Sequence, residues 1–203
     1  MSSRPEQVRW DLLGEHFTTH VLDGDETTAR RQVSRLHRRG VPVRHILDGL
    51  FVPAAVAVGE CWASGAIGVA EEHRATAIME RMLGELTPRV GGRRRGSAVV
   101  ATWEGEHHTL PTTMAAAALR EDRWTVDHLG SGLPTGELVR FVRSASPDLA
   151  VLSVTVHDHH EASEEIGREL EDLGTPTLVG GPGRTLDELC ALSSRRVARL
   201  PRP

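Results

Sequence analysis

The second half of the chain alternates between short apolar runs and longer amphipathic segments, and this alternation limits the possible folds more than any other feature. The apolar runs predict five strands, at 97–103, 124–129, 148–154, 176–180 and 196–200. Helices are predicted between them, at about 109–122, 134–145, 159–173 and 184–193. Alternating strands and helices form a parallel sheet with helices on both faces. We therefore expect a flavodoxin-like (Rossmann-like), doubly wound α/β domain with five parallel strands over residues 96–203.

The first half of the chain shows only helical patterns. Apolar residues recur at helical spacing in four segments, Gln7–Leu22, Ala29–Arg39, His45–Trp62 and Gly68–Leu86. Asp25 is a predicted N-cap for the second segment, and Pro53 predicts a kink or an earlier break in the third. Four helices with short connections form an antiparallel bundle. We therefore predict a four-helix bundle over residues 5–88, followed by a linker rich in glycine and arginine.

The composition argues against several classes of protein. The formal net charge is -4 and every basic residue is an arginine, so the surface as a whole does not favour nucleic acid. Cys61 and Cys190 lack the spacing of a metal site and indicate a reducing compartment without a disulfide framework. We find no signal peptide and no apolar run long enough to span a membrane. We therefore expect a cytoplasmic protein that does not bind membranes.

Two histidines lie directly after the first predicted strand. Glu106, His107 and His108 occupy the loop at its carboxyl end, the edge at which open α/β sheets bind ligands. A neutral imidazole is a good ligand for a transition metal, and a carboxylate such as Glu106 can fix its other nitrogen. Alternatively, the three residues simply cap the helix that begins near Thr109.

Two later strands also end in residues suited to contact with a ligand. Ser153 and Thr155 follow an apolar run, and alternate residues of an extended segment point to the same side, so both hydroxyls could line one slot. Gly180 and Gly181 end the next strand and allow a ligand to approach the backbone closely. Polar residues and glycine pairs close strands in many proteins, so each motif alone is weak. Their position on successive strands makes the set specific.

A third motif lies at a helix–helix connection in the bundle. Trp62 is predicted at the end of one helix, and Glu72 and His73 in the first turns of the next. A carboxylate and an imidazole near a helix start carry adjustable charge. The alternative is a tryptophan in the core and a solvated Glu-His pair.

Three imidazoles and one carboxylate follow the third predicted strand. His157, His159 and His160 surround Asp158, which is also a plausible N-cap for the next helix. A separate metal site is the less favoured interpretation, because adjacent residues rarely converge on one ion.

Taken together, these motifs resemble those of the cobalamin-binding light sensors of the CarH type, over residues 10–200. The resemblance implies that His108 is the lower axial ligand of cobalt, in place of the cofactor's own base. Glu106 and His108 match the family's Glu/Asp-x-His-x-x-Gly signature, but Pro111 replaces its glycine. Proline is acceptable in a first helical turn, whereas the glycine normally lets the chain bend close to the ligand.

The resemblance also implies roles for the later strand ends. The segment that contains Ser153 and Thr155 would hold the buried nucleotide tail of the cofactor, and Gly180 and Gly181 would allow close approach of the backbone. Some cobalamin sensors of this general type also hold a bilin. This implies that His157 and its neighbours contact a second, acidic chromophore such as biliverdin.

In the bundle, the resemblance implies that Trp62, Glu72 and His73 cover the upper adenosyl group of cobalamin. Some members carry a histidine directly after this tryptophan, and it can bind cobalt once light has removed the adenosyl group. Ala63 occupies that position here. Capture of cobalt would then need another residue, such as His73, or water.

The leading prediction is a light sensor that binds adenosylcobalamin between bundle and sheet and changes conformation or oligomeric state on photolysis, rather than an enzyme. We expect a homo-oligomer, a dimer or larger, with the output passing either through this self-association or through a separate output protein. The resemblance does not include the MerR-type helix-turn-helix domain with which these regulators bind operators, so direct nucleic-acid binding is not expected. The alternative function is a corrinoid carrier for methyl transfer. A flavodoxin-like module without cobalamin is hard to reconcile with all the motifs.

Overall fold

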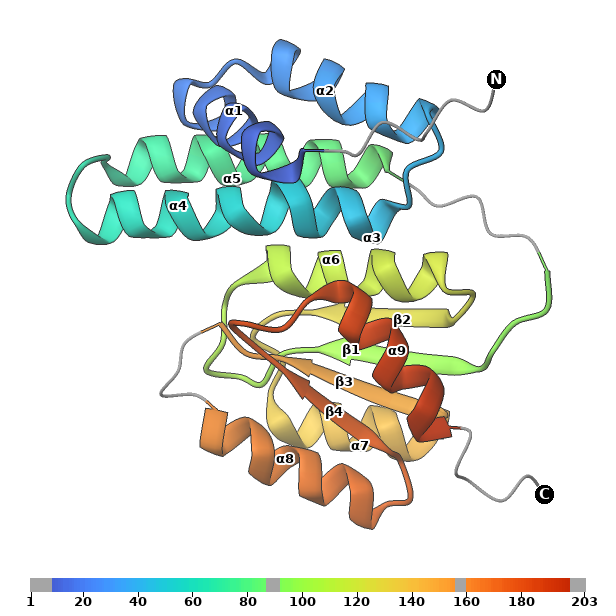
Figure 1. The fold of residues 1–203 in the computed structure, drawn as a ribbon. Helices are drawn as coiled ribbons and strands as arrows, with labels where there is room; N and C mark the ends of the chain where they lie inside the picture. Colours follow the sequence, from blue (N-terminus) through green and yellow to red (C-terminus); the bar gives the residue numbers. More distant parts are fainter. Residues whose placement is uncertain (1–8, 87–91, 156–159, 198–203) are drawn as a thin grey trace, which may run out of the picture. The chain divides into compact units, whose positions relative to one another are not determined.

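The computed structural model describes residues 9–86, 92–155 and 160–197, and the chain forms two compact units, residues 1–86 and 87–203 (Figure 1). The first unit is helical and the second is a parallel sheet with helices. Each unit has its own buried apolar core.

The first unit contains four helical segments, as predicted. They are α1 (Trp10–Asp23), α2 (Glu26–Arg38), the continuous stretch α3 (Val43–Ile46), η1 (Leu47–Phe51) and α4 (Val52–Ala63), and finally α5 (Val69–Glu85). Asp25 is the N-cap of α2, as expected, and its carboxylate accepts a hydrogen bond of 3.0 Å from the Thr28 N–H. Phe17 and Phe51 lie fully buried with ring centroids 5.0 Å apart, which places α1 against the long third segment.

The third segment contains a π-helical turn, η1, where the sequence predicts a kink at Pro53. Proline has no N–H, so the carbonyl of Gly49 cannot accept the usual bond from the residue four positions later. The chain instead forms wider bonds, and the Val52 N–H donates to the Leu47 carbonyl. Proline thus changes the local winding without breaking the helix.

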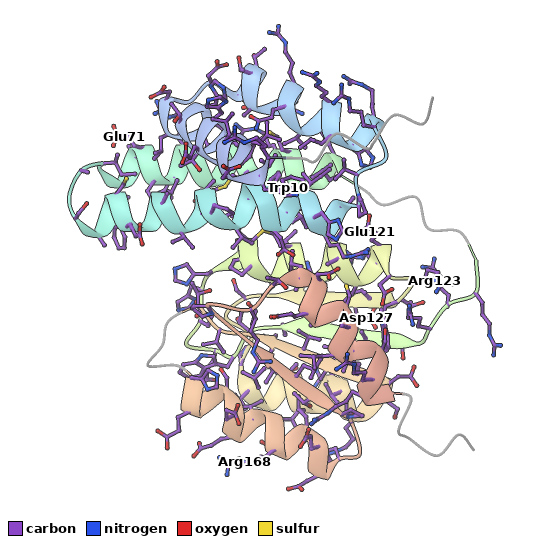
Figure 2. The ribbon with its side chains drawn as sticks, viewed as in Figure 1. Trp10, Glu71, Glu121, Arg123, Asp127 and Arg168 are labelled. Carbon is purple, nitrogen blue, oxygen red and sulfur yellow. The ribbon has the colours of Figure 1, made fainter. Side chains whose placement is uncertain are left out.

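Close packing of α1 against this turn requires glycine. A Cβ on Gly49 would lie 2.1 Å from the ring of Trp10, which Figure 2 labels at the start of α1. A Cβ on Gly14 would lie 2.8 Å from the Gly49 carbonyl oxygen. Glycine at both positions therefore allows the backbones of α1 and η1, and the Trp10 ring, to pack closely together.

The sheet of the second unit has the strand order β2-β1-β3-β4, and every pairing is parallel. Its strands are β1 (Ser97–Ala101), β2 (Thr125–Gly130), β3 (Leu149–Ser153) and β4 (Thr177–Gly180). Its helices are α6 (Thr109–Glu121), α7 (Thr135–Ala145), α8 (His160–Asp172) and α9 (Leu186–Val197). This is the doubly wound α/β arrangement that the sequence predicts.

Alternate residues of the strands pack into two separate apolar clusters, one on each face of the sheet. Val99 and Ala101 pack with residues of α7 and α8 on one face of the sheet. Ala98 and Val100 pack with α6 on the other face, where α9 also contributes Leu186 and Leu189. Helices therefore cover both faces of the sheet, and ligand-binding side chains are expected at the ends of its strands.

The prediction of a fifth strand at 196–200 was wrong for the residues that the structure describes. Arg196 and Val197 end α9, and residues 198–200 lie outside the described part. In this last part of α9, the hydroxyls of Ser193 and Ser194 donate to the carbonyls of Leu189 and Cys190 in the preceding turn, so both are satisfied within the helix. The described sheet consequently has four strands.

One expectation about membranes also needs correction. Within the described residues, the continuous helical stretch Val43–Ala63 is long and apolar enough to cross a bilayer, by length and composition alone. The same test is passed by core helices of globular domains, and this stretch contributes buried side chains such as Leu47 and Phe51 to the bundle core.

We predict that Gly49→Ala destabilises the bundle by about 1–3 kcal/mol, because its methyl group would overlap the Trp10 ring and force α1 away. Gly59→Ala is the matched control. Gly59 lies in α4 with nothing within 4 Å of its added Cβ, so this change should be neutral or stabilising by about 0.5–1 kcal/mol. Chemical denaturation followed by circular dichroism measures both, and equal stability of the two variants would contradict the packing argument.

Candidate functional site

The candidate site lies at the carboxyl ends of three neighbouring strands. Glu106 on the loop after β1 has a side chain that is only 1% exposed. One of its carboxylate oxygens accepts a 2.9 Å hydrogen bond from the Thr155 N–H, just beyond β3. The other accepts a 3.1 Å bond from the His108 N–H and is bonded to Nδ1 of the same histidine. Glu106 therefore ties the first loop to the end of β3.

These hydrogen bonds keep the Glu106 carboxylate ionised. Burial by itself would raise the pKa of this group, but the hydrogen bonds from Thr155 and His108 outweigh burial and lower the pKa to about 2. At neutral pH the carboxylate has no proton to donate, so it can only accept hydrogen bonds.

The state of Glu106 determines which nitrogen of His108 is available. Because the carboxylate only accepts, Nδ1 of His108 must carry the hydrogen that they share. In the neutral ring the lone pair then lies on Nε2. The His108 side chain is 56% exposed, and its Nδ1 is occupied by Glu106, so Nε2 is the nitrogen left to bind a metal ion. A carboxylate that orients a ligating imidazole in this way is a common arrangement at metal sites.

The structure also tests the interpretation that this loop only caps a helix. His108 does occupy the N-cap position of α6, but its side chain makes no capping hydrogen bond. The ring instead bonds to Glu106. The helix start therefore positions the imidazole and leaves it free for another role.

Pro111 fits the helix without disturbing this pair. It is the third residue of α6, where an N–H would have no partner inside the helix. Its fixed torsion angle suits a helical turn. Gly105, earlier in the same loop, has to be small for a separate reason, because a Cβ there would lie 2.3 Å from the Trp103 ring.

The sequence analysis missed a polar residue that holds the loop from within. Thr102, directly after β1, is fully buried, and its hydroxyl donates to the Glu106 carbonyl at 2.8 Å. The same hydroxyl accepts a 3.0 Å bond from the Gly132 N–H, after β2. Ser131 donates to the His107 carbonyl at 3.2 Å. The Ser-Gly pair that follows the second predicted strand was the available signal, since it resembles the ends of the other strands.

The other predicted strand-end residues come together as expected from a parallel sheet. Ser153 pairs with Gly180 in the register of β3 and β4, and the Val154 N–H donates to the Gly180 carbonyl at 2.8 Å. A Cβ on Gly181 would lie 3.1 Å from the Val154 carbonyl oxygen, so this edge needs a small residue there. Thr155 contributes its backbone N–H to Glu106, a contact that the prediction based on its hydroxyl did not include.

Two further histidines of this unit, His107 and His157, were predicted to contact a ligand, and the structure describes only His107. His107 is exposed, and its ring is near Gly132, where an added Cβ would lie 3.1 Å from Nδ1. It does not share the carboxylate of Glu106 with His108. His157 lies outside the described residues, so its predicted contact with a chromophore stays a prediction.

In the first unit, the predicted Trp, Glu and His lie on either side of a tight connection. Trp62 is near the end of α4 and is 52% exposed. Glu72 and His73 lie in the first turns of α5, and Nδ1 of His73 is 3.2 Å from the Glu72 carboxylate and 2.7 Å from the Val69 carbonyl. The alternative of a core tryptophan is therefore wrong, whereas the Glu-His pair is solvated in part: His73 is 74% exposed.

The residues present fit the lower face of a cobalamin. A metal held by a macrocycle needs one protein ligand, and His108 offers one accessible nitrogen with its tautomer fixed. Among the described residues, no group of three or more His, Cys, Asp or Glu side chains could hold a bare metal ion. A single oriented imidazole suits a metal that brings its other ligands with it.

Comparison with protein families gives two matches. A family model described as "B12 binding domain" matches residues 96–198, and a second model with the same description matches residues 13–87. The two matches therefore fall one in each unit of the chain.

Relatives of two kinds are similar to the chain. It is 30% identical to the HTH-type transcriptional repressor CarH of Myxococcus xanthus over 144 residues, which are 70% of this chain and 48% of that protein. It is 29% identical to the repressor CarA of the same organism over 189 residues, 88% of this chain and 61% of that one. The chain therefore spans only about half to three-fifths of the length of these repressors. The trimethylamine corrinoid protein of Methanosarcina barkeri is 22% identical over 176 residues, 82% of this chain and 81% of that one.

A solved structure has the same fold. The monomethylamine corrinoid protein of Methanosarcina barkeri superposes with a TM-score of 0.66 and 13% sequence identity, over 91% of this chain and 96% of that one. A helical unit followed by a parallel sheet is thus shared with corrinoid proteins.

We predict that Glu106 makes stability depend on pH in the acid range. A lowered folded-state pKa stabilises the protein above the ordinary pKa of a glutamate, about 4.5, and this contribution is lost as the pH falls towards 2. Glu106→Gln should lower the unfolding free energy by about 1–3 kcal/mol at neutral pH, and the difference from the parent should shrink across that window. Glu104→Gln is the control, because an amide oxygen can still accept the bond from the Thr135 N–H. Denaturant titrations at several pH values provide the measurement, and a pH-independent difference would contradict the assignment.

Proposed function

Because the chain belongs to the family of proteins with B12-binding domains, we propose that it is a light sensor that binds adenosylcobalamin. The observation that carries the proposal is the Glu106–His108 pair, a buried carboxylate that fixes the proton on Nδ1 and presents Nε2 outward. Sequence similarity to the repressors CarH and CarA supports the sensor over other cobalamin proteins.

In this proposal, the second unit holds the lower part of the cofactor. His108 would hold the cobalt through Nε2, and Glu106 would keep the Nδ1 proton in place and make the ring a better donor. The strand ends at Ser153, Gly180 and Gly181 form a backbone edge that a nucleotide tail can approach. Bound adenosylcobalamin supplies the photochemistry through its light-labile cobalt–carbon bond.

The first unit supplies the residues proposed for the upper face. Trp62 offers an exposed ring, and Glu72 and His73 offer a coupled carboxylate and imidazole at the start of the next helix. Ala63 offers no metal ligand, so His73 is the imidazole of this unit that could hold cobalt, with water as the alternative ligand. A changed fit of these residues would alter the conformation or self-association of the protein, as in other two-state switches.

The second candidate function is a corrinoid carrier for methyl transfer. It is supported by sequence similarity to the trimethylamine corrinoid protein of Methanosarcina barkeri over 82% of this chain. A carrier must expose the upper face of cobalt to partner enzymes, whereas the proposed roles of Trp62, Glu72 and His73 would cover it.

Absorption spectra distinguish the two functions. Purified protein is mixed with adenosylcobalamin in the dark and then illuminated with green light, with size-exclusion chromatography before and after. A bound spectrum that changes irreversibly, together with a shift in elution, supports the sensor. Binding without either response favours the carrier, and absence of binding refutes both.

We predict that His108→Ala abolishes the spectral change that accompanies coordination of cobalt by an imidazole. His107→Ala is the matched control, since the neighbouring ring does not contact the Glu106 carboxylate, and it should bind as the parent does. Glu106→Gln should weaken binding by about 10–100-fold, because it removes the group that orients the ligand. Equal losses in the His107 and His108 variants would contradict the assignment of the ligand.

A bilin as second chromophore is a separate proposal. It is supported only by the histidine-rich segment 157–160, of which the structure describes His160 alone. Mixing with biliverdin tests it, and an unchanged biliverdin spectrum would eliminate it. The cytoplasmic location and the separate output protein stay predictions.

A further inference from the structure

A small hollow lies between helices α2 and α5 of the first unit, and it contains no residue of the candidate site. Its volume is about 160 Å³, and it is partly open to solvent. The two helices end on the same side of this unit in Figure 1, and the last turns of both line the hollow. A cavity of about 150 Å³ is large enough to hold a benzene ring, so the hollow has room for a molecule of that size.

The floor of the hollow is apolar. Val33 of α2 and Met82 and Leu86 of α5 line it, and each of these side chains is at most 3% exposed. Small-molecule sites typically combine such an apolar lining with a few polar groups. The floor therefore favours contact with an apolar group over contact with water.

Three polar side chains of α2 border the same hollow. Ser34, His37 and Arg38 are three and four positions apart, so they share one face of the helix. Within the described residues, the Ser34 hydroxyl, the His37 ring and the Arg38 guanidinium have no hydrogen bond or ion pair. All three can donate hydrogen bonds, and arginine suits a carboxylate in particular, because its planar group donates two parallel bonds.

The other charged groups around the hollow neutralise one another. Arg30 is paired with Glu26 and Glu85, and Arg81 is paired with Glu26 as well. Hydrogen bonds from Arg81 and Arg30 lower the pKa of Glu26 to about 2, so this carboxylate stays charged at neutral pH. Of the two guanidinium groups that line the hollow, Arg38 is consequently the one that no described carboxylate balances.

The ends of the two helices oppose an anion, but the arginines outweigh them. A helix C-terminus carries a partial negative charge of about half an elementary charge. Arg35 and Arg38 lie in the last turn of α2, and Arg39 follows as its C-cap, each with a full positive charge. The potential at the mouth of the hollow is therefore positive.

We propose that this hollow binds a small carboxylate with an apolar body, such as an aromatic monocarboxylic acid. The apolar body would lie on Val33, Met82 and Leu86, and the carboxylate would accept hydrogen bonds from Arg38 and Ser34. The site belongs to the first unit alone and needs no cobalamin, so it goes beyond the proposed light response. A ligand there would contact both helix ends and so stabilise the bundle.

Neither a small anion without an apolar body nor a neutral apolar molecule uses both parts of the hollow. Acetate would leave most of the apolar floor in contact with water. A neutral ring would leave the Arg38 guanidinium without a charged partner. The combination of floor and cation is what identifies the class of ligand.

Benzoate is a suitable probe for the full chain, free of cobalamin and kept in the dark. A titration followed by ligand-observed NMR gives its dissociation constant, which we expect on the order of 1 mM for so small a ligand. Acetate and benzyl alcohol are the matched control ligands, since the first lacks the ring and the second lacks the charge. Each should bind about tenfold more weakly than benzoate, or less.

Three variants locate the site. Arg38→Gln removes the unbalanced charge and should weaken benzoate binding by about tenfold or more. Arg39→Gln is its control, because Arg39 is exposed and does not line the hollow, and its affinity should stay within about twofold of the parent. Ser34→Leu fills the hollow with all charges kept and should abolish binding. Leucine has a higher helix propensity than serine, so folding should be kept, and circular dichroism checks this.

Several outcomes would overturn the proposal. Absence of benzoate binding to the parent at about ten times the expected dissociation constant would remove the site. Equal losses in the Arg38 and Arg39 variants would show a general attraction of anions to the arginines. Equal affinity for benzoate and either control ligand would show that the hollow does not select both charge and apolar body.

A separate titration with adenosylcobalamin keeps this proposal distinct from the proposed function. The cofactor should not displace benzoate, and the three variants should bind it as the parent does. Displacement would place benzoate in the cofactor site and overturn the proposal. Failure of the parent to bind adenosylcobalamin, with benzoate binding intact, would refute the proposed function and support the hollow as an independent site.

Discussion

A single buried carboxylate organises the edge of the sheet at which the candidate site lies. Glu106 accepts hydrogen bonds from the backbone beyond β3 and from both the backbone and the ring of His108. Removal of the carboxylate would leave these part-buried N–H groups without their acceptor. The orientation of the candidate metal ligand and the junction between two strand ends therefore depend on the same group, so the stability of this edge and its affinity for a metal are linked.

Much of the architecture could be predicted from the sequence because its signals are periodic. The helices of the bundle, the N-cap at Asp25 and four of the five strands follow from apolar spacing and capping chemistry. The fifth strand was wrong at Arg196 and Val197, which end α9, because short apolar runs do not distinguish a strand from the end of a helix. The π-turn was missed because a proline in a helix predicts a disturbance without specifying its form.

The candidate site was predictable in its residue types and less so in its contacts. His108 and Glu106 were identified by spacing, and the structure joins them. The amide of Thr155 could not be identified, because backbone donors carry no distinctive signal in one sequence. For the buried Thr102, the available signal was the Ser131-Gly132 pair, whose glycine amide donates to the Thr102 hydroxyl. The fold alone does not separate the sensor from the carrier, since a corrinoid protein has a similar fold.

The π-turn before Pro53 affects residues far along the same helix. Each residue of an α-helix turns the chain by about 100°, and a π-turn acts as one added residue within the helix. Without η1, every later side chain of α4 would face a direction rotated by about that angle. Trp62 lies two turns and more beyond the proline and is exposed in the present register. The missing N–H of Pro53 therefore influences the side of the helix on which the Trp62 ring lies, although the two residues are more than two turns apart.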